Sequence, residues 1–282
     1  MSTKSPVCWI GGKCHSASKI VDCLPLPPTY KHFVDVFGGG AHVLFRKPQY
    51  NHLETYNDYD GNLVNFWMQC RDHPNELQSL IDSLPYSRSL YEDWVESIRN
   101  GEELCPLERA ARWFYVLRSS ISGKLGQTKG DWGYSKEAGR NHARSLHNAA
   151  GLFTEASERM RCVQIECKSF SDIICRYQRD NVVFYCDPPY IGHERYYKGA
   201  PIFGLNDHKV LSELLNATKA KVALSYYPHP LLAELYPGTR WRIVTWDTYK
   251  HAEMVQPGST RQKSTEILIM NYDQADARMA WS

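Results

Sequence analysis

Residues 182–190 read VVFYCDPPY, an apolar run that ends abruptly in Asp187, two prolines and Tyr190. The run predicts a buried β-strand, and the prolines end it because neither supplies a backbone N–H. A stiff loop at the carboxyl end of a strand lies where open α/β sheets bind ligands. There, the Asp187 carboxylate and the Pro188 carbonyl could accept both hydrogens of an exocyclic amine while Tyr190 stacks on its ring. A Pro-rich surface turn is the simpler alternative.

Much earlier in the chain, residues 32–37 form a short apolar run that leads into three glycines at 38–40. Residues 41–45 can then begin a helix, and a strand, a glycine turn and a helix N-terminus together open a nucleotide-type α/β fold. The next predicted strand, residues 53–56, ends at Asn57-Asp58. An acidic residue about 20 positions after such glycines suits ribose hydroxyls, which makes Asp58 a candidate ligand. An Asn-Asp turn or a helix cap is the alternative.

The remaining pattern alternates between helices and strands. Residues 62–121 have helical periodicity, with Cys105-Pro106 as the start signal of the last helix. Further strand candidates are residues 163–165, 222–225, 241–246 and 266–270. Asn206 or Asp207 can cap a helix among them. Because the last two strands have no helix between them, we expect an α/β fold whose mostly parallel sheet has an antiparallel edge.

Charge is unevenly distributed along the chain. All 282 residues carry 33 Lys and Arg against 31 Asp and Glu, a net charge of +2. Residues 118–144 alone hold six basic and two acidic side chains, a net of +4, so the remainder is net −2. The near-neutral total argues against a simple basic coat protein for nucleic acid, whereas the basic segment favours local contact with a polyanion.

The nine cysteines include no C-x-x-C pair, which argues against a zinc knuckle or a redox motif and suits a reducing compartment. Cys8, Cys14 and Cys23 with His15 are too loosely spaced to support a metal site, and we expect none. The N-terminus has no apolar signal region, and no stretch approaches about 18 apolar residues. We therefore expect a cytoplasmic protein without a membrane partner.

Four motifs occur in order: WIGGK at 9–13, DVFGGG at 35–40, Asn57-Asp58, and DPPY at 187–190. Together they resemble the Dam-like DNA adenine-N6 methyltransferases, which place the glycine motif first, target recognition in the middle and D-P-P-Y last. The resemblance implies a Rossmann-like sheet that binds S-adenosyl-L-methionine (SAM), plus a helical target-recognition insertion. It implies a catalytic domain at 1–65 and 149–282 and an insertion of helices and a basic loop or hairpin at 66–148.

The resemblance also implies roles for individual residues. The residues that bind the cofactor would be Trp9, Gly11, Gly12, Lys13, Asp35, Phe37, Gly39, Asp58, Phe170 and Asp187. Trp9 would line the pocket, with Lys13 near the methionine end of SAM. Asp58 would bind the ribose, and Phe170 would contact the cofactor adenine. The catalytic residues would be Asp187, Pro188, Pro189 and Tyr190.

Two positions depart from the family pattern. Ala41 stands where the second glycine of the motif falls, which leaves Gly38 and Gly40 to keep the turn flexible. Ser169 replaces the usual aspartate before the aromatic residue, so a polar contact expected there is in doubt.

The basic middle segment supplies the expected contacts to DNA. Its candidates are Arg118, Lys124, Lys129, Lys136 and Arg140, joined after D-P-P-Y by Arg195 and Lys198. Arginine is the better residue for bidentate contact to guanine. Trp132 or Tyr134 either wedges into the base stack or folds the hairpin onto the helices, and both readings stay open.

The mechanism that the resemblance implies needs no metal, because the leaving group is a neutral thioether. An adenine inside a duplex must flip out to reach the cofactor, and in-line attack by N6 then requires mainly positioning. Double-stranded DNA is the expected partner, a restriction endonuclease of the same system is a further candidate, and we expect a monomer or weak dimer. The alternatives are an RNA adenine or protein N-methyltransferase and a catalytically silent DNA-binding relative.

Overall fold

The computed structural model describes residues 3–50, 52–121, 131–135, 141–194, 203–249 and 263–273. Its strands form one sheet in the order β3-β2-β1-β4-β5-β7-β6. Their bounds are β1 (His32–Asp35), β2 (Leu53–Asn57), β3 (Val163–Glu166), β4 (Val182–Cys186), β5 (Lys221–Tyr226), β6 (Arg242–Tyr249) and β7 (Lys263–Met270). Strands β1 to β5 pair in parallel, and β7 pairs antiparallel to both β5 and β6. The predicted Rossmann-like sheet with an antiparallel edge is confirmed.

The order of the strands reverses at β1. The chain builds outward from β1 through β2 to β3, and later continues on the other side of β1 with β4 and β5. In register, Asp35 of β1 lies beside Tyr56 of β2 and Tyr185 of β4. Open sheets bind ligands beyond the carboxyl ends of the strands at such a switch point. Asp58 and Asp187 directly follow β2 and β4, so they reach the same edge as Asp35.

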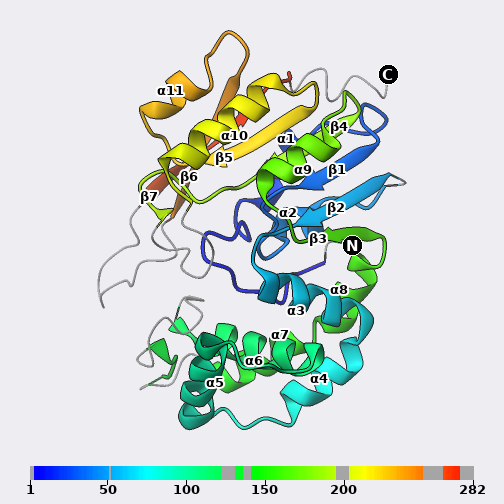
Figure 1. Ribbon diagram of the computed structural model, residues 1–282, viewed down its shortest axis with the longest axis vertical. Helices are drawn as coiled ribbons and strands as arrows, with labels where there is room; N and C mark the ends of the chain where they lie inside the picture. The colour runs from blue at the N-terminus through cyan, green and yellow to red at the C-terminus, as the bar shows by residue number, and fades with distance from the viewer. Residues whose placement is uncertain are drawn as a thin grey trace.

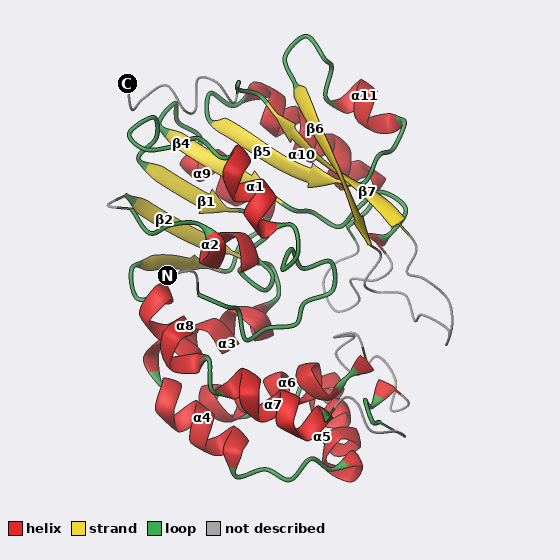
Figure 2. Cartoon of the chain, turned by 180° about the vertical axis from the view of Figure 1, so that it is seen from behind, coloured by secondary structure: helices red, strands yellow, loops and turns green. Residues whose placement is uncertain are grey.

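Helices cover both faces of the sheet (Figures 1 and 2). One face carries α9 (Phe170–Tyr177), α10 (Leu205–Ala217) and α11 (Leu231–Leu235), and the other carries α1 (Ala17–Cys23) and α2 (His42–Arg46). Each face has its own apolar core, and successive residues of β4 alternate between them: Val183 joins one and Phe184 the other. A strand that is buried on both faces reads as a continuous apolar run, which is why residues 182–186 were recognisable in the sequence.

The remaining helices lie between β2 and β3 in the chain. They are α3 (Gly61–Asp72), α4 (Pro74–Asp82), α5 (Arg88–Asn100), α6 (Pro106–Ser119), α7 (His142–Ala150) and α8 (Phe153–Met160). Helices α4 to α7 form a lobe beside the sheet, and α3 and α8 connect this lobe to it (Figure 1). We call α4 to α7 the helical lobe.

An aromatic cluster around Phe66 of α3 joins the helical lobe to the sheet. The Phe66 ring stacks on Phe114 of α6, with centroids 5.2 Å apart and planes at 5°, and it contacts Trp113 and Phe153 at 5.4 and 5.7 Å. These rings belong to the same core as the α1–α2 face of the sheet. The boundaries at 65/66 and 148/149 stay a prediction, because α3 begins at Gly61 and packs against both α6 and α8.

Two predicted helix starts had different outcomes. Helix α6 begins at Pro106 after Cys105, as predicted. Helix α10 is capped by Gly204, so the prediction of Asn206 or Asp207 as the cap was wrong. Asp207 lies in the first turn instead, where its carboxylate accepts the Gly204 N–H at 2.8 Å, and this contact satisfies a donor that precedes the helix.

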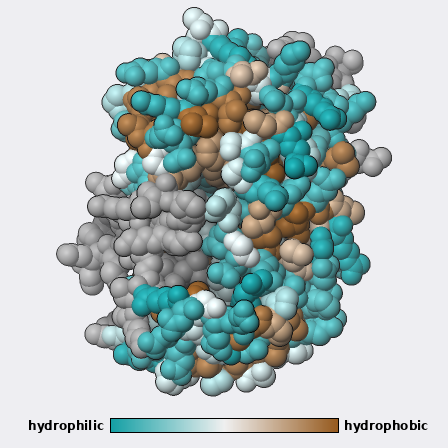
Figure 3. All heavy atoms as spheres, in the orientation of Figure 1, coloured by the Kyte–Doolittle hydropathy of each residue, from teal (hydrophilic) through white to brown (hydrophobic). Residues whose placement is uncertain are grey.

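The visible surface is mainly hydrophilic outside the undescribed residues, and apolar side chains gather above α10 and α11 (Figure 3). No helix in the part of the chain that the structure describes has the length and apolar character needed to cross a membrane. All nine cysteines are free thiols.

Candidate active site

The glycine turn after β1 has a different backbone from the one that the motif alone suggests. Positive φ angles occur at Gly39 (48°) and Ala41 (55°), so the left-handed positions of the turn lie there and not at Gly38 or Gly40, the two glycines expected to keep it flexible. Gly38 is required for space instead, because a Cβ there would lie 2.2 Å from the Tyr56 ring. Ala41 adopts the left-handed conformation that ordinarily favours glycine.

Two side chains hold the turn in place. The Tyr56 hydroxyl and the Trp67 Nε1–H both donate to the Gly39 carbonyl, at 2.8 and 3.2 Å. Asp58 accepts the Gly39 N–H at 2.8 Å with Oδ2 and the Asp60 N–H at 2.9 Å with Oδ1. Burial raises the pKa of Asp58 to about 6. The helix cap considered as an alternative role for Asp58 falls to Asp60, whose Oδ1 accepts two N–H groups of α3.

Asn57 connects the turn to the segment that precedes α9. Its Nδ2 donates to the carbonyls of Val36 and Lys168, at 2.9 and 3.1 Å, and its Oδ1 accepts the Lys168 N–H at 2.9 Å. The motif that contains Asn57 predicted no role for this residue by itself. Its buried amide fixes the ends of β1, β2 and β3 relative to one another, since it bonds to the backbone that follows two of these strands.

Three phenylalanine rings meet beside this junction. Phe37 and Phe170 stack with centroids 5.7 Å apart and planes at 25°, and Phe203 contacts both at 5.8 and 5.5 Å. Ser169, at the position where the family pattern has aspartate, is the N-cap of α9 and accepts the Asp172 N–H at 3.1 Å. Phe203 was not identified from the sequence. The three rings form an apolar surface suited to a flat heterocycle.

Trp9, Gly11 and Gly12 lie against the glycine turn from the N-terminal side. A Cβ on Gly39 would lie 2.8 Å from Trp9 Cδ1, and a Cβ on Gly12 would lie 2.9 Å from the His42 ring, so both glycines permit close packing. Gly11 has a φ of 71°. Trp9 also contacts Trp113 of α6 at 6.1 Å, which places the N-terminal segment between the sheet and the helical lobe.

The Asp187 carboxylate is paired on one oxygen and open on the other. Lys13 Nζ lies 2.7 Å from Asp187 Oδ2 and donates to the Gly11 carbonyl at 2.9 Å. Asp187 Oδ1 is buried without a hydrogen-bond partner. Burial raises the pKa of Asp187 to about 6, although the Lys13 ammonium acts in the opposite direction. The resemblance placed Lys13 near the methionine end of the cofactor, and the structure brings its ammonium onto the Asp187 carboxylate.

Glu266 of β7 completes this buried group, and the sequence did not single it out. Its Oε1 lies 3.5 Å from Lys13 Nζ and accepts the Tyr190 hydroxyl at 3.2 Å, while its Oε2 accepts the Ser16 hydroxyl. Only 4% of Glu266 is exposed. The available signal was one carboxylate at the start of an otherwise apolar strand, residues 266–270, where a buried charge must have a partner.

The Tyr190 ring is packed on several sides. It contacts Tyr226 at 5.5 Å and Tyr227 edge-on at 4.6 Å, and Lys13 Nζ lies 4.9 Å from its centroid. Asp35, at the end of β1, also has a buried Oδ1 without a partner, and its pKa is raised well above the usual range by burial, then by Asp187 and Asp58. The carboxyl ends of β1 and β4 therefore carry two buried acceptors, Asp35 Oδ1 and Asp187 Oδ1, that no donor of the described protein satisfies.

The described part of the basic segment packs on the helical lobe. Trp132 contacts Tyr86 and Tyr134 at 5.4 and 5.6 Å, and the Arg88 guanidinium lies 4.8 Å from its centroid. Trp132 therefore folds this segment onto the helices, as one of the two readings proposed, whereas Tyr134 is 48% exposed. Arg118 Nη2 donates to the carbonyl and hydroxyl of Ser145, each at 3.0 Å. Outside the described residues lie Lys124, Lys129, Lys136, Arg140, Arg195 and Lys198.

The donor set fits SAM better than it fits a metal. Buried carboxylates without full partners suit a cationic, hydroxyl-rich ligand, and the three phenylalanines suit its purine. Among the residues that the structure describes, no three His, Cys, Asp or Glu side chains are placed to hold a metal ion.

Comparison with known proteins gives a family match over most of the chain. A family model described as D12 class N6 adenine-specific DNA methyltransferase matches residues 9–251. The type II methyltransferase M1.LlaDCHI of Lactococcus lactis subsp. cremoris is 27% identical, covering 94% of each chain. The type II methyltransferase M.CviBI of Paramecium bursaria Chlorella virus NC1A is 23% identical, covering 95% of this chain and all of its own. The rRNA methyltransferase aviRa of Streptomyces viridochromogenes aligns with 94% of this chain and 86% of its own at 13% identity, with a TM-score of 0.31 that is too low to support any conclusion.

Proposed function

Because this chain belongs to the D12 class N6 adenine-specific DNA methyltransferase family and is a DNA adenine methyltransferase, we propose that it moves a methyl group from SAM to N6 of an adenine flipped out of double-stranded DNA. One observation carries the proposal. Asp187 Oδ1 is a buried acceptor without a partner, on a carboxylate whose other oxygen is held by Lys13. The exocyclic amine of an adenine would supply the hydrogen-bond donor that this buried oxygen lacks.

The residues of the site divide the work on the adenine. Asp187 Oδ1 and the Pro188 carbonyl accept the two N6 hydrogens, which favours a pyramidal nitrogen whose lone pair is available. Tyr190 holds the base by its ring. Lys13 keeps the Asp187 carboxylate ionised because an ammonium 2.7 Å away favours the charged form. These contacts align N6 for in-line attack, and the rate gain comes mainly from positioning. Once N6 carries the methyl group it gives up one hydrogen as a proton, for which the Asp187 carboxylate is the adjacent acceptor.

SAM, when bound, supplies an electrophilic methyl group on a sulfonium with a neutral thioether as leaving group. Phe37 and Phe170 would hold its purine, Asp58 its ribose, and Trp9 with Gly11 and Gly12 would line the pocket. Asp35 supports this assignment, because its buried, unpartnered oxygen at the end of β1 can face a cation. Asp58 Oδ1 and Oδ2 already accept backbone N–H groups, so the ribose would use their remaining lone pairs.

The identity of the methyl acceptor is tested directly with tritiated SAM. Duplex DNA, RNA and a protein mixture are offered separately, and label is expected on adenine of the duplex. Label confined to RNA or protein would favour the alternatives, and no transfer with intact DNA binding would indicate a silent DNA-binding relative. Sequencing DNA methylated in a methylation-free host then gives the recognised site.

Contact with DNA through the basic segment is tested by salt dependence. Lys124→Gln with Lys129→Gln should reduce the slope of log K against log [salt] by about 2, because each phosphate contact contributes about 0.9. Lys198→Gln tests the segment after D-P-P-Y in the same assay. An unchanged slope in both would remove these lysines from the DNA surface.

We also propose that the enzyme acts as a monomer or weak dimer in the cytoplasm and that a restriction endonuclease reads the same site. The type II names of the two relatives support the last point. Loss of viability on deletion of the gene, rescued by deletion of a neighbouring nuclease gene, is the expected result if such a partner exists.

A further inference from the structure

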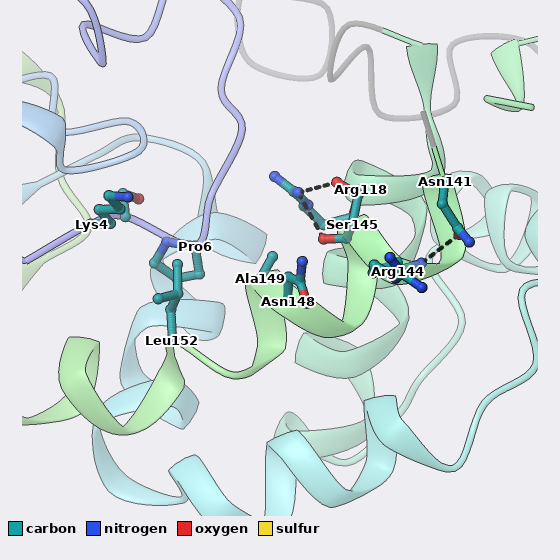
Figure 4. A pocket seen from close by; sticks show the side chains of 10 residues that line it. Lys4, Pro6, Arg118, Asn141, Arg144, Ser145, Asn148, Ala149 and Leu152 are labelled. Carbon is teal, nitrogen blue, oxygen red and sulfur yellow. Dashed lines mark hydrogen bonds between the residues drawn. The ribbon is translucent and has the colours of Figure 1, made fainter. Parts of the chain in front are cut away.

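A hollow of about 400 Å³ separates the N-terminal segment from helix α7 (Figure 4). Lys4 lies on one side of it, and Arg118, Arg144 and Asn148 lie on the other. None of the residues that line it belongs to the site around Asp187. Its place in the molecule is the junction between the helical lobe and the segment that leads to Trp9.

The chemistry of the hollow is that of an anion site. Three basic side chains line it, Lys4, Arg118 and Arg144, and no acidic residue does. Arg118 is half-buried and oriented in advance, because its Nη2 donates twice to Ser145. Lys4 and Arg144 are exposed, so they can close on a ligand from the rim. A pre-oriented guanidinium with a second cation nearby is the usual arrangement for a phosphate oxygen pair.

The position of the hollow points to DNA rather than a small anion. Lys4 precedes Trp9 by five residues, which span at most about 18 Å. Trp9 packs against Trp113 of α6. Arg118 lies five residues after Trp113 in the same helix, a rise of about 7.5 Å along the helix axis. A duplex rises about 3.4 Å per base pair. The hollow therefore lies within several base pairs of the glycine turn and the site beside it.

We propose that this hollow binds one backbone phosphate of the DNA substrate, through Arg118 at its base and Lys4 and Arg144 at its rim. The proposal rests on the proposed function, since it assigns a second contact to the same duplex. Holding a phosphate at the junction of sheet and helical lobe would fix the duplex relative to both, so that the target base faces Asp187.

The test uses Lys4→Gln with Arg144→Gln, and leaves Arg118 intact because it bonds to Ser145. The matched control is Arg179→Gln with Lys219→Gln. These two exposed cations precede β4 and β5, at the amino ends of the strands and so opposite the ends where Asp187 lies. The first pair should weaken duplex binding about tenfold at moderate salt and reduce the salt slope by about 1, whereas the control should change neither. Equal effects in both pairs, or none, would overturn the proposal.

A duplex with one neutral methylphosphonate link, scanned along the backbone, locates the phosphate. Wild-type affinity should fall at one link near the target adenine, and the Lys4→Gln/Arg144→Gln variant should be insensitive at that link alone. Sensitivity of the variant at every link that affects the wild type would refute the site. Methylation of adenine by the wild type is measured in parallel. If the wild type transfers no methyl group to adenine, the proposed function is wrong, and the binding data alone then decide whether the hollow binds a phosphate.

A separate observation, the buried Glu266 carboxylate, carries a second inference: we infer that Glu266 is a positioning residue for the two side chains that flank Asp187. It accepts the Tyr190 hydroxyl and lies 3.5 Å from the Lys13 ammonium. Its other oxygen accepts the Ser16 hydroxyl, and Ser16 Oγ in turn accepts the Trp246 Nε1–H at 3.5 Å. Glu266 thus fixes Tyr190 and Lys13 from behind while Asp187 Oδ1 stays open.

Glu266→Gln keeps the volume and one acceptor oxygen for the Tyr190 hydroxyl, but it removes the charge and replaces the other oxygen with an NH2 group that donates. We expect a 10- to 100-fold lower kcat with little change in SAM affinity or Tm, and partial recovery in Glu266→Asp. The acid limb of the pH–rate profile should move to lower pH, since the Glu266 charge raises the pKa of Asp187. A structural role alone would lower Tm and leave the limb in place, and that result would overturn the inference.

Discussion

Two buried groups of charges lie on the same sheet, and they are built in opposite ways. At the carboxyl edge, Lys13 pairs with Asp187 and Glu266, two carboxylates for one ammonium. On β2, Glu54 pairs with Lys47 at 2.6 Å and with Arg159 at 2.6 and 2.9 Å, two cations for one carboxylate.

Hydrogen bonding separates the two groups further. Both Glu54 oxygens accept charged donors, and Arg159 also donates to the Leu44 carbonyl, so this group ties β2 to α2 and α8. Asp187 keeps one oxygen without a partner. The pKa of Glu54 is lowered, because the hydrogen bond from Arg159 and the charge of Lys47 outweigh its burial, whereas burial raises that of Asp187 to about 6. The Glu54 carboxylate, with both oxygens bonded, joins these elements, whereas the Asp187 carboxylate keeps one oxygen for a ligand.

The largest expected effect is on stability, at the satisfied group. Glu54→Gln leaves Lys47 and Arg159 buried without their anion, which should lower the free energy of unfolding by roughly 3–5 kcal/mol. Urea unfolding at pH 7 measures it, with the exposed Asp82→Asn as control because its pair with His147 is worth less than about 1 kcal/mol. If Glu54→Gln lowered the free energy of unfolding by less than Asp82→Asn does, the stabilising role assigned to the Glu54 group would be wrong.

The next effect is on activity, at the open group. Asp187→Asn should lower kcat by about 10²–10³-fold, roughly 3–4 kcal/mol, because asparagine offers one acceptor oxygen instead of two and Lys13 competes with the reacting amine for it. Duplex binding should persist. The free energy of unfolding at pH 7 should not fall, since Lys13 retains Glu266 and a carboxylate disfavoured by burial is removed. Full activity in this variant would show that the Asp187 carboxylate of D-P-P-Y takes no part in methyl transfer.

The pH dependence separates the groups by sign. Asp187 has a raised pKa, so its contribution to stability is present below its unfolded pKa and is lost as the pH rises through about 6. Glu54 has a lowered pKa, so its contribution is present above its unfolded pKa and is lost as the pH falls through the folded value.

Activity should follow Asp187. Because the carboxylate must be ionised to accept N6 hydrogens, kcat should fall about tenfold for each pH unit below about 6. Asp58 also has a pKa of about 6, owing to burial, so SAM affinity is measured separately across the same range. A rate that stays level down to pH 4 would exclude Asp187 as an ionised acceptor.

The smallest effect concerns the backbone beside the open group. Ala41 has a φ of 55°, a conformation that costs a residue with a Cβ about 1 kcal/mol or more. Ala41→Gly relieves this strain, but it removes a fully buried methyl group and makes the unfolded chain more flexible, so the free energy of unfolding should change by less than about 1 kcal/mol in urea unfolding. Gly101→Ala, at a φ of 63° with open space around it, removes no buried group and should lower the free energy of unfolding by about 1 kcal/mol. A larger loss at Ala41 than at Gly101 would contradict the strain assigned to the turn.

The sequence by itself determined the features that depend on neighbouring residues. The apolar run at 182–186, the prolines after it, the glycines at 38–40 and the Cys105-Pro106 helix start are local, because backbone geometry and strand burial are set within a few positions. The apolar run and the glycines predicted the sheet and the carboxyl ends of the strands where Asp58 and Asp187 lie, and the last two strands, which have no helix between them, predicted the antiparallel edge.

Tertiary structure alone decided which charges pair and which stay open. Ser16 and Glu266 are 250 residues apart, and Glu54 and Arg159 are 105 apart. The local pattern at 266–270 shows one carboxylate on an otherwise apolar strand, but it does not show that Lys13, Ser16 and Tyr190 are the partners that satisfy Glu266. In the unfolded chain water solvates each charged side chain separately. Burial removes that water, so each charge then depends on whichever partners the fold has brought next to it.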